Sequence, residues 1–172
     1  MRNFPYILIL ALLISCGNDK PKIDPKIIIE ANVLRSYDTL IAYQDTSLHK
    51  AFDVKLSIIN KSEEPVSFWI MTCSWDENFI INNDYISFLG WGCDSNYPRL
   101  KHLNSNSRFD LKAAVIKYDF TRYQPIKTTK FGLIFIDSAI CTNIRDYDNI
   151  IGDKSKQDKI IWSNPIYLNE KR

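Results

Sequence analysis

Residues 52–60 read FDVKLSIIN, and this stretch carries the clearest structural signal in the chain. Apolar and polar side chains alternate along it. The apolar set is Phe52, Val54, Leu56 and Ile58, and the polar set is Asp53, Lys55 and Ser57. Because successive side chains of a strand point to opposite faces, this alternation predicts a β-strand with one face in a core and the other in water.

A polar segment and a second alternating run follow this stretch. Residues 60–65 read NKSEEP, a composition that is typical of a turn. Residues 66–70 read VSFWI, in which every second side chain is again apolar and bulky. Two alternating runs joined by a short polar turn indicate a β-hairpin, so we expect residues 52–60 and 66–70 to form an antiparallel pair.

Further strand-like segments run through the rest of the chain. They cover residues 27–34, 37–43, 78–81, 85–89, 109–115, 130–137, 160–162 and 165–168. Residues 145–159 are polar and are expected to form a loop, with a helical turn as the open alternative. Many short strands with turns between them predict an all-β fold, an immunoglobulin-like antiparallel β-sandwich of about seven to nine strands. We expect this single domain to span residues 27–172.

The N-terminus carries the pattern of an export signal. Arg2 precedes an apolar run at residues 4–14, which is shorter than the roughly 20 residues that a membrane-spanning helix needs. The run ends in Leu13-Ile14-Ser15-Cys16-Gly17, which resembles the lipobox of bacterial lipoproteins. The resemblance implies that residues 1–15 are a signal peptide and that Cys16 becomes a lipid-modified N-terminus.

The same resemblance implies a location in the cell envelope. Acyl chains on Cys16 would anchor the protein to a membrane, and residues 16–26, which are polar and hold two prolines, would form a flexible tether. Gly17 stands where an aspartate signals inner-membrane retention in some bacteria, so the outer membrane is favoured. The formal net charge is only +2, and basic residues form no cluster, so we expect no nucleic-acid partner.

Three cysteines remain once Cys16 is assigned to the lipid. In an oxidising compartment they can form a disulfide. We favour Cys73–Cys93, because these residues flank a short aromatic-rich segment, and closing it would stabilise the fold by roughly 3 kcal/mol. Cys141 would then be a buried free thiol. Pairing of Cys141 with either of the other two is the open alternative.

Aromatic residues gather around these cysteines. The candidate binding residues are Trp69, Trp75, Trp91 and Tyr97. One interpretation is that Trp69 or Trp75 packs on the disulfide inside the sandwich, as in immunoglobulin domains. The other is that the aromatic rings form an exposed platform for a sugar or a peptide, since such rings give large contact area at low entropy cost.

Nothing in the sequence points to catalysis. The two histidines, His49 and His102, sit in no catalytic motif, and no phosphate loop, nucleophile elbow or zinc-protease motif is present. Cys73, Cys93 and His102 lack the spacing of a metal site. We therefore expect no catalytic residues, no metal and no cofactor.

Residues 54–75 read VKLSIINKSEEPVSFWIMTCSW and resemble the second and third strands of small exported lipoproteins with immunoglobulin-like domains. The resemblance implies an anchor and a fold, with no activity attached. Our first hypothesis is a membrane-anchored, non-catalytic binding module for an envelope protein or a glycan. The alternatives are a structural or assembly subunit of an envelope complex, and a small inhibitor or hydrolase.

Overall fold

The computed structural model describes residues 26–40, 48–90, 93, 95–118, 128–153 and 160–168. The predicted signal peptide, the predicted lipidation site Cys16, nearly all of the predicted tether and Trp91 lie outside these ranges. Within them the chain is an all-β sandwich of antiparallel sheets, which confirms the predicted fold class. The described residues hold ten strands, against the expectation of about seven to nine.

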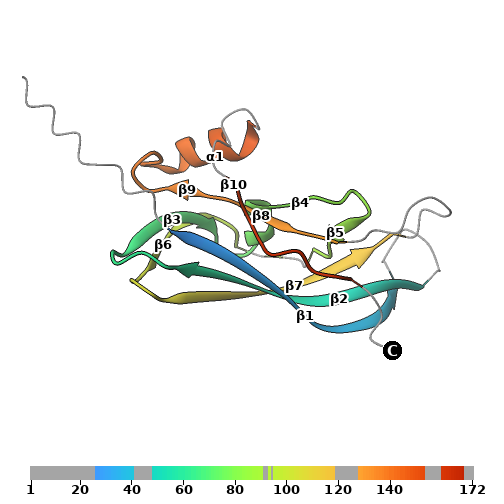
Figure 1. Cartoon of the computed structure of the whole chain (residues 1–172). Helices are drawn as coiled ribbons and strands as arrows, with labels where there is room; N and C mark the ends of the chain where they lie inside the picture. Colours follow the sequence, from blue (N-terminus) through green and yellow to red (C-terminus); the bar gives the residue numbers. More distant parts are fainter. Residues whose placement is uncertain are drawn as a thin grey trace, which may run out of the picture.

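The first sheet has four strands, and the stretch FDVKLSIIN lies at its centre (Figure 1). The strand order is β1 (Ile27–Leu40), β2 (Leu48–Asn60), β7 (Arg108–Lys117) and β5 (Ile86–Phe88). The four apolar residues of the alternation in β2 are all buried, as predicted. Burial of each such side chain contributes roughly 1.5–3 kcal/mol, which explains why this strand is so strongly specified. β1 is one long strand with an irregularity between Val33 and Arg35, where the sequence suggested two strands.

The second layer consists of two three-stranded sheets that share one stretch of chain. One has the order β10 (Ile160–Trp162), β8 (Phe131–Ile134) and β4 (Phe79–Ile81), and the other has the order β6 (Pro98–Leu103), β3 (Val66–Met71) and β9 (Ile136–Asp137). Only Phe135 separates β8 from β9, so residues 131–137 contribute a strand to each of the two sheets. Phe131, Leu133 and Phe135 all join the main core, as their alternation predicted.

The predicted hairpin between residues 52–60 and 66–70 is wrong. β2 pairs with β1 and β7, whereas β3 pairs with β6 and β9. The connection at residues 60–65 therefore passes from one sheet to the other. Alternation specifies which face of a strand is buried, but it does not specify the neighbouring strand.

The side chain of Asn60 holds this crossing in place. Its amide nitrogen donates to the carbonyl oxygens of Glu64, Leu103 and Asn104 at 2.8, 3.2 and 3.1 Å. Its Oδ1 accepts from the backbone nitrogen of Ser62 at 2.9 Å. Asn60 is fully buried, so these bonds replace those that its amide would make to water.

The segment predicted as a loop contains a helix. α1 (Ile144–Gly152) lies on the outer side of the second layer (Figure 1). Tyr147, Ile150 and Ile151 pack against Ile134 and Ile136 in a second, smaller core. A short polar helix has little stability alone, so this packing accounts for its formation.

Residues 165–168, predicted as a strand, make only one bridge, from Ile166 to Thr129. The preceding Asn164 closes the sandwich on this side. Its Oδ1 accepts from the backbone nitrogen of Ala31 at 2.8 Å, and its Nδ2 donates to the carbonyl oxygen of Ala31 at 3.1 Å. The carboxamide thus takes the place of a neighbouring strand along this part of β1.

Candidate functional site

The structure separates the aromatic residues that the sequence grouped together. Trp75 opens the short 3-10 helix η1 (Trp75–Asn78) and is buried in the main core. Its ring contacts those of Phe79 and Phe88 edge-to-face, with centroids 5.8 and 6.1 Å apart. Trp75 therefore lies inside the sandwich, where its ring contacts these two phenylalanines, and it is not available as part of a surface platform.

Trp69 has the opposite orientation. Phe68 and Ile70 point into the main core, so Trp69 lies on the outer face of the second layer, where it is half-buried. Its neighbours across the sheet are Leu100 on β6 and Ile136 on β9. Its indole Nε1 donates to the carbonyl oxygen of Cys141 at 2.8 Å, which fixes the ring orientation while part of the ring remains exposed.

Tyr97 lies just before β6 and is exposed. Its backbone bonds with that of Thr72, three residues along the chain from Trp69. Nearby, Cys73 and Cys93 form the favoured disulfide, with their Cα atoms 6.1 Å apart, and Cys141 is a buried free cysteine. The alternative pairing with Cys141 is therefore wrong. Burial raises the pKa of the Cys141 thiol, and the charge of Asp146 raises it further.

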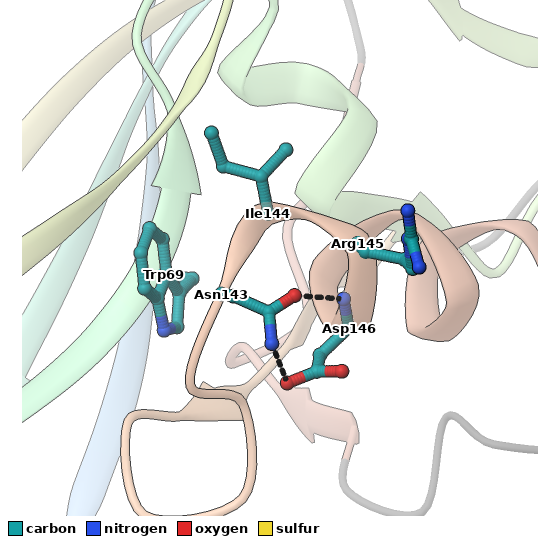
Figure 2. A pocket seen from close by; sticks show the side chains of 5 residues that line it. All are labelled: Trp69, Asn143, Ile144, Arg145 and Asp146. Atoms are coloured by element: carbon teal, nitrogen blue, oxygen red, sulfur yellow. Dashed lines mark hydrogen bonds between the residues drawn. The ribbon is translucent and has the colours of Figure 1, made fainter.

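An open pocket of about 760 Å³ lies between Trp69 and the first turn of α1 (Figure 2). Its lining residues are Trp69, Asn143, Ile144, Arg145 and Asp146. Ile144 is 53% exposed, and nearby in the chain Ile140 is 62% exposed. We call this depression the Trp69 pocket.

The polar groups of the Trp69 pocket are largely occupied by the N-terminal cap of α1. Asn143 Oδ1 accepts from the backbone nitrogen of Asp146 at 3.1 Å, and Asn143 Nδ2 donates to Asp146 Oδ2 at 2.8 Å (Figure 2). The same carboxylate oxygen accepts from the Thr142 backbone nitrogen and hydroxyl at 3.1 and 3.0 Å. This arrangement is similar to a capping box, except that the Asp146 carboxylate bonds Thr142, the residue before the N-cap Asn143, and it stabilises the helix start. What the pocket offers a partner is therefore mainly the indole, Ile144 and the guanidinium of Arg145.

The opposite face of the sandwich has a different character. Along β1, β2 and β7, the outward side chains form a network in which Arg108 pairs with Glu30 and Asp110, and Lys55 pairs with Asp110. Ser57 Oγ donates to Asp110 at 2.6 Å. Such exposed, mutually paired charges are well solvated, so a partner would gain little binding free energy by displacing water from them.

Ser67 and His102 meet on the outer face of β3 and β6. Ser67 Oγ lies 2.7 Å from His102 Nδ1, and both side chains are on an open strand surface and outside the Trp69 pocket. In the part of the chain that the structure covers, His, Cys, Asp and Glu side chains form no group of three that could hold a metal ion. The described helices include none that is long and apolar enough to cross a membrane.

The sequence singled out Trp69, but the four other residues of the pocket were missed because no helix was predicted from residue 144 onward. Two signals could have found them. Asn143 and Asp146 have the spacing of a capping box, and Ile144, Tyr147 and Ile151 have the i, i+3, i+7 spacing of an amphipathic helix. No protein-family model and no curated protein matches this chain.

Proposed function

We propose that this chain is a lipid-anchored protein of the cell envelope whose β-sandwich is a non-catalytic binding module. Its contact surface is the Trp69 pocket, and its partner is a protein or a glycan of the envelope. The lipobox-like Leu13-Ile14-Ser15-Cys16 supports the anchor.

One observation carries the binding part of the proposal. The Trp69 pocket joins a half-buried indole to the exposed Ile144, with the exposed Ile140 close by in the chain, whereas on the opposite face exposed aliphatic residues such as Leu34 lie on a surface that carries paired charges. Apolar side chains left in water beside an oriented tryptophan are the features that binding surfaces share. Because the Asp146 carboxylate is engaged in the helix cap, the pocket has the composition of a contact surface and lacks an activated nucleophile.

A matched pair of variants tests this surface in the full-length protein. Ile144→Glu places a charge in the Trp69 pocket at a helix start, where an acidic residue is tolerated. Leu34→Glu changes a comparably exposed aliphatic residue on β1, which is 47% exposed. We expect cross-linking in the native envelope to capture a defined partner. Ile144→Glu should lower the amount of captured partner at least tenfold, and Leu34→Glu should leave it unchanged. Equal capture by both variants would contradict the assignment of the pocket.

The anchor is tested separately. We expect the purified native protein to begin at Cys16 and to carry the mass of attached acyl chains, and Cys16→Ser to leave the membrane fraction. A native protein that begins at Met1 would overturn this part of the proposal and leave the test of the pocket unaffected.

A further inference from the structure

The outer edge of β6 is an open strand edge. β6 pairs with β3 on one side, and within the described residues no strand pairs with its other side. The hydrogen bonds of β3 establish which groups face that edge. Thr72 donates to the carbonyl oxygen of Tyr97, and on the far side of β3 the Met71 nitrogen donates to Asn78. Because bonding direction alternates along an antiparallel ladder, the peptide groups of Leu100 and His102 point away from β3.

Other edges of the sandwich are closed by asparagine side chains. Asn164 bonds both backbone groups of Ala31 on β1. Asn78 donates to the carbonyl oxygen of Trp69 and accepts from the nitrogen of Met71, beside the short β9. Asn60 bonds the carbonyl oxygen of Leu103 at the end of β6, but in the described part of the chain no side chain bonds the outward peptide groups of Leu100 and His102. Pro98 is two residues before Leu100, so its backbone groups also point away from β3. Proline has no N–H, and at this position no bond to β3 is lost.

The charge of this edge is positive. β6 reads PRLKHL and contains no acidic residue, and neither Arg99 nor Lys101 has an ion-pair partner among the described residues. Lys101 Nζ lies over the ring of Phe109, 4.1 Å from its centroid, and is partly exposed. A second copy of β6 added antiparallel about Leu100 would place Arg99 opposite Lys101, and such like-charge pairs are unfavourable. The edge therefore selects against self-association and in favour of an acidic strand.

We propose that β6 binds an extended acidic segment of a partner protein by strand addition. The segment alternates acidic and apolar residues, with an apolar residue opposite Leu100 and acidic residues opposite Arg99 and Lys101. The apolar side chain would extend the row that Leu100, Trp69 and Ile136 form on the outer face. Main-chain bonds to Leu100 and His102 supply affinity, and the flanking charges supply specificity. This inference rests on the proposed binding function and names its partner as a protein.

Synthetic peptides test the proposal directly on the full-length protein in detergent. One is a seven-residue peptide that alternates glutamate with valine, and the control has lysine in place of glutamate. We expect the acidic peptide to bind and the basic one to bind at least tenfold more weakly. Arg99→Glu with Lys101→Glu should reverse this preference, whereas Lys112→Glu, an exposed charge on the opposite face, should leave it unchanged.

A backbone variant separates strand addition from simple charge attraction. Leu100→Pro removes one outward N–H without removing a bond to β3, so it should weaken the acidic peptide about tenfold. Equal binding of both peptides, unchanged binding by Leu100→Pro, or no binding of either peptide would each overturn the inference. If the charge reversal of β6 leaves partner capture intact while Ile144→Glu abolishes it, strand addition fails and the proposed binding function stands.

Discussion

The hydroxyl of Tyr147 on α1 donates a 2.9 Å hydrogen bond to Oδ1 of Asn78 in η1, and both side chains are buried. The same Oδ1 accepts from the backbone nitrogen of Met71, and the amide nitrogen of Asn78 donates to the carbonyl oxygen of Trp69. One asparagine thus joins the helix to the strand that carries Trp69. This connection links the two sides of the Trp69 pocket, because Trp69 belongs to β3 and the other lining residues lie at the start of α1.

Removal of the Tyr147 hydroxyl and removal of the Asn78 side chain should both destabilise the protein, but to different extents. We expect Tyr147→Phe to lower the free energy of unfolding by about 1 kcal/mol, since Asn78 Oδ1 keeps its bond to Met71. Asn78→Ala should cost about 3 kcal/mol, because the buried Tyr147 hydroxyl and two part-buried backbone groups lose a partner. Urea denaturation measures both, and Tyr167→Phe, at a residue that is 64% exposed, is the control. An Asn78→Ala variant as stable as the parent would contradict the role of this network.

Alkaline pH should weaken the fold through Tyr147. Burial raises its pKa above the ordinary value near 10, and nearby acidic residues such as Glu77 raise it further, although the bond to Asn78 opposes this. Above pH 10 the unfolded state loses this proton while the folded state retains it. The contribution of Tyr147 is therefore complete below pH 10 and falls by about 1.4 kcal/mol per pH unit above it.

The comparison with Tyr147→Phe isolates this effect from other titrating groups. We expect the stability difference between parent and variant, measured by denaturation from pH 9 to pH 11, to shift in favour of the variant as pH rises. A difference that stays constant with pH would show that Tyr147 titrates normally.

Gly132 should not tolerate a side chain. A Cβ at this position of β8 would lie 2.7 Å from Cγ2 of Ile160 and 3.0 Å from side-chain atoms of Ile80 and Trp162. We expect Gly132→Ala to cost about 1–3 kcal/mol, because side chains of the neighbouring strands on both sides must shift. Gly90→Ala is the matched control, since nothing lies within 4 Å of its added Cβ. Thermal melting of the two variants compares them, and equal midpoints would contradict the crowding.

The disulfide should contribute strongly to stability, whereas the free Cys141 should be unreactive in the folded protein. The disulfide closes a loop with a sequence separation of 20, so Cys73→Ser with Cys93→Ser should lower stability by roughly 3 kcal/mol. Cys141 is buried, and its raised pKa reduces its thiolate fraction. We therefore expect a thiol reagent at pH 8 to label Cys141 only when the protein is unfolded in denaturant. Rapid labelling of the native protein would show that this thiol is accessible.

The strands with the strongest alternation were predictable because periodicity is a local property. In residues 52–60 and 130–137 each side chain's position relative to its neighbours was enough to assign a buried face. The choice of Cys73–Cys93 also rested on local spacing, and the structure confirms it. Of the candidate site, the sequence indicated Trp69 alone, since the other pocket residues depend on a helix that was assigned to a loop.

The amino-acid sequence by itself therefore determined the all-β class, the inward faces of the main strands and the disulfide. Only the tertiary structure decided that β2 and β3 lie in different sheets, that α1 is a helix, and that Asn60, Asn78 and Asn164 bond to distant backbone. The physical reason is that these features depend on partners far apart in the chain. A strand's neighbour, a short helix's packing surface and the bonds of a buried amide are selected by burial of the whole chain together, which a local pattern cannot specify.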